Sequence, residues 1–278
     1  MKRAIARWQT WWLRLFVLLV IALLVVPIPK PFDVALMAAA FGLSFVRAPQ
    51  STRPAVELAP PVRGRWVALN SPGNAVPSHG VKAYGQMYAV DLLQPSADAA
   101  TSIGWSIRTR APETYPCFGA PVLAMAAGTV VRATDRQRDH RSRDTWPALI
   151  WMMTIEAFAR ELAGASRILG NHVIVDQGDG VFAVYAHLRR GSARVRAGER
   201  VEAGQQLAEV GNTGNTSEPH LHVQVMDRAE PTAAAGMAMR WAGVAAGEVD
   251  PRWSTGEPKP SGMAGFPRNG QVFEASAD

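Results

Sequence analysis

Short hydrophobic runs separated by glycine turns dominate the chain from residue 67 to residue 227. Pro121–Ala133 has the pattern of two strands around a turn, and Asn171–Leu188 contains two β-rich runs joined by Gly178-Asp179-Gly180. A series of short strands with glycine turns is typical of an all-β sandwich or barrel. We therefore expect a mainly β fold with antiparallel pairing in this part of the chain.

Residues 135–169 interrupt the β pattern. A charged stretch is followed there by helix-forming residues with few β-branched positions, which predicts a helix over Pro147–Leu162 inserted between strands. The last segment, residues 228–278, is rich in Gly, Pro and Ala, so we expect a loop-rich extension. Within that extension, "PRNGQVF" predicts one turn followed by a short strand.

The N-terminal residues 1–47 contain two apolar runs. The first, Leu15–Pro27, follows four basic residues and has Trp11 and Trp12 at its edge, which predicts a membrane segment. The second, Val34–Val46, would cover only about 20 Å of a hydrocarbon core roughly 30 Å thick. An uncleaved anchor, a cleaved signal peptide and a helical hairpin are the possible interpretations.

Charge around these runs gives conflicting signals about topology. Four arginines after the second run favour a hairpin with the domain inside: Arg47, Arg53, Arg63 and Arg65. The second run is too short to span, however, and the basic residues before the first helix usually dominate orientation. We expect a single-pass anchor in the cell membrane, a proline-rich linker over residues 48–66, and an extracytoplasmic domain.

Overall charge and cysteine content restrict the partners and the chemistry. The 278 residues carry a formal net charge of +6, which favours anionic surroundings such as phospholipid or wall polymers. No aromatic-basic interleaving or helix-turn-helix pattern supports nucleic acid as a partner. Cys117 is the single cysteine, which excludes an internal disulfide and a CxxC metal site. Any metal site must therefore use His, Asp or Glu.

The stretch "PHLHVQV" places two of the six histidines two residues apart. Side chains alternate between the faces of a strand, so His220, His222 and Gln224 share one face if this stretch is a strand. The intervening Leu221 and Val223 then point to the core. Two imidazoles are thus directed toward one location.

Other histidines and a carboxylate have a similar setting. His79 lies in the loop "NAVPSHGVKAYG", Asp91 follows "GQMYAV", and His187 ends the hairpin in "VYAHL". Histidine and aspartate ligands suit Zn²⁺ with a fourth position left for water, whose pKa the metal lowers to near 7. Histidines that do not bind metal can transfer protons. Zinc chemistry by itself leaves open which histidine has which role.

Four motifs together resemble the lysostaphin-like zinc endopeptidases of peptidoglycan: "SHG…YAVD", "FGAPVLAMAAGTVV", "GNHVIVDQGDGVFAVYAHL" and "VEAGQQLAEVGNTGNTSEPHLHVQV". The resemblance covers Ser78–Val225, apart from the insert. It implies a small antiparallel β-sandwich or groove built from a duplicated hybrid motif. It also implies that zinc binds His79, Asp91 and His222. His187 and His220 then flank the metal's water as base and transition-state stabiliser.

Two features depart from the family pattern. The family usually has three residues between its first His and its Asp, whereas eleven lie between His79 and Asp91, so His79 must reach in from a longer loop. His140 in the insert is the alternative ligand. The family's tyrosine before the first His is missing, and Tyr84 or Tyr88 is the candidate for its role.

Three other functions were weighed against a zinc endopeptidase. A biotinyl or lipoyl carrier needs a lysine on a hairpin, and none occurs between Lys82 and Lys259. A histidine phosphocarrier would explain His187 and His220 but not Asp91 and His222. A catalytically silent relative would bind peptidoglycan or activate another wall hydrolase. Because a full ligand set is present, we expect an enzyme that hydrolyses peptide cross-links or stem peptides of peptidoglycan.

Overall fold

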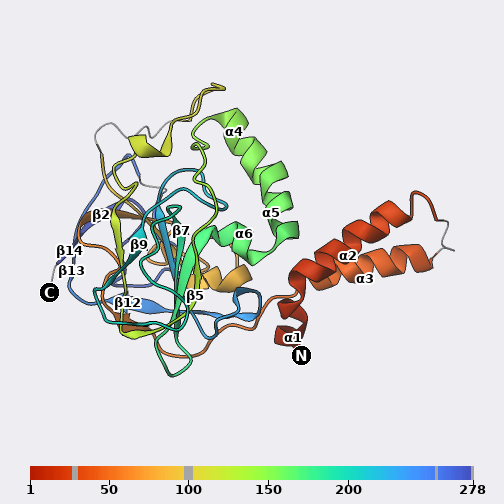
Figure 1. Ribbon diagram of the computed structural model, residues 1–278, viewed down its shortest axis with the longest axis horizontal. Helices are drawn as coiled ribbons and strands as arrows, with labels where there is room; N and C mark the ends of the chain where they lie inside the picture. The colour runs from red at the N-terminus through yellow and green to blue at the C-terminus, as the bar shows by residue number, and fades with distance from the viewer. Residues whose placement is uncertain (27–30, 97–102, 254–255, 277–278) are drawn as a thin grey trace.

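The N-terminal helices project from the body of the protein as a hairpin (Figure 1). The computed structural model describes residues 1–26, 31–96, 103–253 and 256–276. It begins with α1 (Lys2–Arg7), α2 (Gln9–Ala22) and α3 (Phe32–Ser44), and α3 packs back along α2. The Phe16 and Phe41 rings lie 5.0 Å apart between the two helices. Within the described residues, no helix combines the length and apolarity needed to cross a bilayer.

This arrangement corrects the single span predicted over Leu15–Pro27. The 14 residues of α2 extend about 21 Å and end at Ala22, where the chain turns and returns toward the body along α3. Pro27 itself lies outside the described residues. The apolar run that suggested one long helix is therefore divided between a short helix and a turn.

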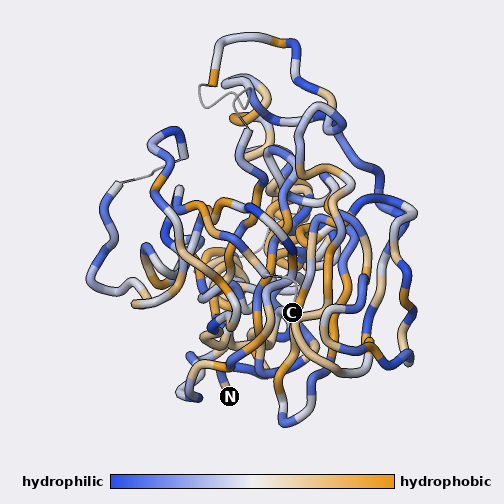
Figure 2. Tube along the Cα trace, turned by 90° about the vertical axis from the view of Figure 1, so that its left-hand side faces the viewer, coloured by the Kyte–Doolittle hydropathy of each residue, from blue (hydrophilic) through white to orange (hydrophobic). Residues whose placement is uncertain are grey.

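A large antiparallel sheet forms the core of the body, and the prediction of a mainly β, antiparallel fold is confirmed. In the described residues its order is β13-β14-β2-β3-β10-β7-β6-β5-β8, with β11 also paired to β10. Its central strands are β2 (Gly64–Leu69), β3 (Val90–Leu93), β10 (Leu221–Met226), β7 (Phe182–Leu188), β6 (Asn171–Asp176) and β5 (Gly128–Thr134), and β8 (Arg200–Val201) is an edge strand. Hydrophobic segments gather inside the body, and hydrophilic segments are more frequent on its outside (Figure 2).

The two faces of the sheet have different roles. Leu221 and Val223 point into the main hydrophobic core, together with Val90 and Leu92 of the neighbouring strand. A two-stranded sheet of β4 (Pro121–Leu123) and β9 (Gln206–Glu209) contributes further side chains to that core. The opposite face presents the polar residues of β3 and β10, as period-two alternation requires.

The segment after residue 227 contains more strands than its composition predicts. After η4 (Pro231–Ala233) come β11 (Gly236–Met237), β12 (Met239–Trp241), β13 (Val244–Val249) and β14 (Gln271–Ala275). β14 pairs with β2 and extends the main sheet, and β12 pairs in parallel with β1 (Val56–Leu58) of the proline-rich segment. Pairing with distant strands orders this segment, which local composition does not reveal.

The insert at 135–169 is helical in its second half. α4 (Trp146–Trp151) continues through a π-helical stretch, η3 (Met152–Glu156), into α5 (Ala157–Ala163), and α6 (Ala165–Leu169) leads into β6. Arg14 Nε of α2 donates a hydrogen bond of 2.8 Å to the Leu162 carbonyl. The insert therefore links the N-terminal hairpin to the polar face of the sheet. Two short 3₁₀ helices besides η4, namely η1 (Ala83–Tyr88) and η2 (Pro112–Thr114), complete the fold of the described residues.

Candidate active site

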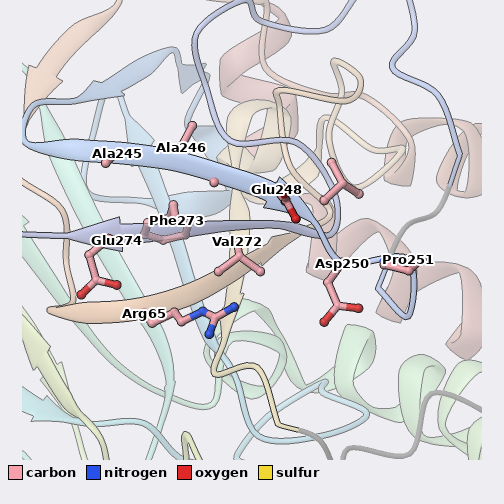
Figure 3. Close-up of a pocket in the computed structure, with 11 residues that line it drawn as sticks. Arg65, Ala245, Ala246, Glu248, Asp250, Pro251, Val272, Phe273 and Glu274 are labelled. Atoms are coloured by element: carbon pink, nitrogen blue, oxygen red, sulfur yellow. The ribbon is translucent and has the colours of Figure 1, made fainter.

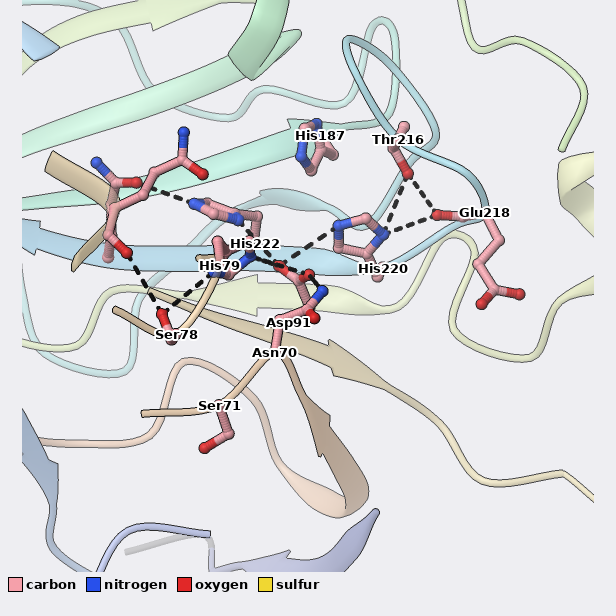
Figure 4. Close-up of polar contacts among 12 residues, drawn as sticks. Asn70, Ser71, Ser78, His79, Asp91, His187, Thr216, Glu218, His220 and His222 are labelled. Atoms are coloured by element: carbon pink, nitrogen blue, oxygen red, sulfur yellow. Dashed lines mark hydrogen bonds and ion pairs between the residues drawn. The ribbon is translucent and has the colours of Figure 1, made fainter. Parts of the chain in front are cut away.

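Asp91 and His222 face each other on neighbouring strands. They are direct partners in the register of β3 and β10, so their side chains leave the same face of the sheet. His222 Nδ1 lies 2.9 Å from Asp91 Oδ1 (Figure 4). Asp91 is 6% exposed and His222 is 3% exposed.

His79 reaches the same carboxylate from the long loop before β3. Its Nε2 lies 3.1 Å from Asp91 Oδ2, and its Nδ1 lies 3.2 Å from Ser78 Oγ. The loop turns back sharply through Tyr84 and Gly85, whose φ angles are 57° and 75°. The structure therefore brings together His79, Asp91 and His222 despite the eleven residues between the first two.

These three residues offer a suitable set of donors for a metal ion. One ligand atom from each, two imidazole nitrogens and a carboxylate oxygen, lie within 4.8 Å of one another. The buried Gln224 Oε1 lies 2.9 Å from His222 Nε2 and is an acceptor, so it fixes the proton on Nε2. Nδ1, which faces Asp91, is then the nitrogen that would give up its proton to bind a metal ion. Asn70 Nδ2 donates to Asp91 Oδ2 at 2.8 Å and orients that carboxylate.

Asn70 and Gln224 were not predicted as site residues. The sequence does indicate a position for Gln224 beside the site, because Gln224 continues the alternation that places His220 and His222 on one face. No sequence pattern indicates Asn70, since its contact with Asp91 depends on the pairing of β2 with β3.

The charges of this group support one another. Burial alone would raise the pKa of Asp91, but the imidazoles of His79 and His220 and the hydrogen bond from His222 hold it well below its usual value. Burial acts to lower the pKa of His222, and its contacts with Asp91 and Gln224 outweigh burial and raise it. The carboxylate therefore remains ionised, as a ligand for a cation must.

His187 and His220 stand next to this group with their rings 4.8 Å apart. His187 Nδ1 lies 2.8 Å from the Thr213 carbonyl, and His220 Nδ1 lies 2.8 Å from the Glu218 carbonyl. Since a carbonyl oxygen only accepts, each Nδ1 carries a proton and each Nε2 is left with a lone pair. Burial lowers the pKa of both rings, that of His187 to well below its usual value, so both are neutral at neutral pH.

A bulge in β7 turns His187 toward the site. The register between β6 and β7 pairs Asn171 with Leu188 but Val173 with Tyr185, so β7 holds one extra residue there. His187 has a φ of 62°, in the left-handed region. Simple alternation puts Tyr185 on the same face as His187, but the bulge separates them. Tyr185 is buried in the main core, where its hydroxyl accepts from the Met125 N–H at 2.7 Å.

The five predicted site residues line one cavity of about 440 Å³. Its walls also include Arg47, which follows α3, and Tyr84 of η1. Met152 and Glu161 of the insert line it as well, so the helical insert lies beside the site. A larger cavity of about 630 Å³ beside β13 and β14 is lined by Arg65, Glu248, Asp250 and Glu274 and contains none of the histidines (Figure 3).

The two remaining histidines have structural positions. Both ring nitrogens of His140 lie near backbone carbonyls, of Arg141 at 2.9 Å and Gly214 at 3.0 Å, so it is not placed as the alternative ligand. His172 is fully buried with Nδ1 2.7 Å from the Gly170 carbonyl, and burial lowers its pKa to about 4.

Comparison with known proteins gives matches to one family of peptidases. Residues 157–234 match the model of Peptidase family M23. Peptidoglycan DD-endopeptidase ShyA of Vibrio cholerae is 35% identical over 65 residues, which are 23% of this chain and 15% of that protein. Cell division protein DipM of Caulobacter vibrioides is 41% identical over 68 residues, 22% of this chain and 11% of that protein. The chain thus spans less than a fifth of the length of these curated relatives.

A solved structure aligns over a longer part of the chain. The catalytic domain of the antimicrobial peptidase lysostaphin from Staphylococcus simulans aligns with 59% of this chain and 84% of its own, at 21% identity and a TM-score of 0.34. The family model covers the segment that carries three of the five predicted site residues. Over that segment, with His187, His220 and His222, the chain is similar to Peptidase family M23.

Proposed function

We propose that this protein is a zinc-dependent endopeptidase that hydrolyses peptide bonds in the cross-links or stem peptides of peptidoglycan. The observation that carries the proposal is the convergence of His79, Asp91 and His222, with ligand atoms within 4.8 Å of one another, beside two neutral imidazoles. His79, Asp91 and His222 would hold the zinc ion, which when bound supplies a Lewis acid and lowers the pKa of water.

The two other histidines supply proton transfer. Each presents an unprotonated Nε2, because its Nδ1–H is fixed on a backbone carbonyl. Nε2 of one ring takes a proton from the attacking water, and that ring then holds the N–H that the leaving amine needs. The second ring, whose centroid is 4.8 Å from the first, would take a proton from solvent on its own Nε2 and then stabilise charge that develops on the substrate oxygen.

The substrate class rests on the relatives. Two of the similar proteins from Vibrio cholerae are named peptidoglycan DD-endopeptidases, which supports a peptide of the bacterial wall as substrate. The net charge of +6 agrees with an anionic wall or membrane environment.

Metal analysis and turnover test this proposal together. The purified chain should contain one equivalent of zinc and release fragments from whole sacculi, and mass analysis of those fragments, with sacculi of differing cross-link type, identifies the bond. His172→Gln is the matched control, because His172 is a buried histidine outside the cavity. Zinc without turnover would refute the enzyme activity and leave a catalytically silent relative, and absence of zinc would overturn the metal site.

We propose further that the hairpin of α2 and α3 attaches the protein to a lipid surface, with the β body on the outer side of the cytoplasmic membrane. Large apolar side chains on the hairpin are exposed, among them Leu18, Leu24 and Phe32. Exposed apolar side chains gathered on one element are typical of a membrane or protein contact. A reporter that works only after export should be active when fused after Asp278. Activity of a cytoplasmic-only reporter would refute this location and wall hydrolysis with it.

A further inference from the structure

The lining of the catalytic cavity includes a cation that no step of the proposed hydrolysis uses. Arg47 follows α3 and lines the same cavity as His79, His187 and His220. Its Nη1 donates to the Ser44 carbonyl at 2.6 Å and lies 3.4 Å from the Val46 carbonyl. Among the described residues, neither Nη2 nor Nε makes a hydrogen bond, and no ion pair includes Arg47.

The neighbouring acid is already engaged. Glu161 of α5 accepts a hydrogen bond from the Tyr84 hydroxyl, and that hydroxyl accepts from Gln9 Nε2 at 2.9 Å. This chain of contacts connects α2, η1 and α5. It holds the Glu161 carboxylate in place without an ion pair to Arg47, although the two groups attract each other.

Partial burial makes the guanidinium a strong anion binder. Arg47 is half-buried, and this burial removes part of the water around its charge and lowers its pKa from the usual value. A guanidinium with an open Nε and Nη2 edge matches the two oxygens of a carboxylate. Apolar side chains of Met152, Ile168 and Leu169 line the same cavity.

From this geometry we propose that Arg47 is a specificity-determining residue, which binds a free carboxylate of the peptide close to the bond that is cut. The inference rests on the proposed function, since it places the carboxylate in the same cavity as the histidines. The N-terminal hairpin thereby contributes directly to the substrate site, since Arg47 is held by the carbonyl groups at the end of α3.

Binding of two matched peptides tests the proposal separately from catalysis. The probes are two synthetic cross-linked stem-peptide dimers of the same sequence, one with free carboxylates beside the cross-link and one with carboxamides. Affinity is measured by calorimetry on the full chain carrying His220→Ala, so that neither dimer is consumed. We expect the carboxylate dimer to bind about 10- to 100-fold more tightly, as a charge-assisted pair of hydrogen bonds provides.

Variants of Arg47 then identify the source of that preference. Arg47→Met should bind the two dimers with equal affinity, and Arg47→Lys should keep part of the preference for the carboxylate dimer. Arg200→Met, which removes one positive charge at an exposed position of β8, should leave that preference unchanged. General damage to the hairpin would weaken the binding of both dimers equally. Thermal unfolding of each variant detects such damage.

The outcomes separate this inference from the enzyme function. The carboxylate subsite is overturned if the two dimers bind equally, if neither binds, or if the preference survives in Arg47→Met. Each of these results is possible even if the wild-type protein cuts peptidoglycan. A preference lost in Arg47→Met supports the subsite, even if the wild-type protein cuts nothing and the proposed hydrolysis fails.

Discussion

Replacing Gln224 with Met should weaken zinc binding without removing any ligand. Gln224 is fully buried, its Oε1 accepts from His222 Nε2 at 2.9 Å, and its Nε2 donates to the Tyr84 carbonyl at 2.7 Å. Met has a similar length and shape but no equivalent acceptor. His222 must then either bury an unpaired Nε2–H or move its proton to Nδ1, the atom directed at Asp91.

The expected losses of zinc affinity and of folding stability can be given typical magnitudes. Loss of the partner that orients a metal-bound histidine typically weakens metal affinity by about 10- to 100-fold, which is about 1.4–2.7 kcal/mol. Leaving a buried donor unpaired costs about 1–3 kcal/mol of folding stability as well. The variant should therefore be less stable than wild type even without zinc, and it should bind zinc more weakly.

Competition with a chromogenic chelator measures the zinc dissociation constant, and urea unfolding of the metal-free protein measures stability. Gln206→Met is the matched control, because Gln206 lies on β9 and, within the part of the chain that the structure describes, its side chain donates only to the Ala208 carbonyl at 3.2 Å. A zinc dissociation constant for Gln224→Met within twofold of wild type would show that the proton on His222 is not positioned by Gln224, and the assignment of Nδ1 as ligand would be lost.

Further variants test the separate roles of the histidines and the structure behind them. His222→Ala should lose zinc and activity, and stoichiometric zinc in that variant would refute its role as a ligand. His187→Ala and His220→Ala should keep most zinc and lose about 100-fold or more in rate; loss of zinc in either would make that residue a ligand. Gly170→Ala should destabilise the fold by at least about 1–3 kcal/mol and slow turnover, because an added Cβ would lie 2.4 Å from the carbonyl oxygen that orients His187; wild-type rates would contradict this. Since burial lowers the pKa of His172 to about 4 in the folded protein, the unfolded chain binds more protons below pH 6.5, so the free energy of unfolding should fall by up to about 3 kcal/mol as pH drops from 6.5 to 4. Urea unfolding of His172→Gln should show a smaller fall, and an identical pH profile would contradict the assignment.

The face of β10 that carries the site could be predicted because strand alternation is a local property. Leu221 and Val223 are core residues and His220, His222 and Gln224 lie on the opposite face, as the sequence pattern indicates. Asp91 follows the same rule on β3, where Val90 and Leu92 point into the core. The roles of these residues came from a resemblance to a family, because alternation says nothing about chemistry.

Features that depend on pairing between distant strands could not be predicted. The bulge in β7 separates Tyr185 from His187, and only the register with β6 reveals it. The strands after residue 227 form because β14 finds the edge of β2. At the N-terminus, composition indicates an apolar segment, but the end of α2 at Ala22 and the return along α3 decide its geometry.

The long loop between the metal-ligand candidates His79 and Asp91 contacts the helical insert, so the two departures from the family pattern are structurally connected. The eleven residues between His79 and Asp91 contain η1, and Tyr84 of η1 makes contacts in two directions. Its carbonyl accepts from Gln224, the residue that orients His222, and its hydroxyl donates to Glu161 of the insert. A loop with three residues between the ligands would have no room for this turn. The added loop length therefore connects the zinc-site candidates to the insert, and through Gln9 to the N-terminal hairpin, so the parts of the chain that depart from the family pattern meet at the same wall of the cavity.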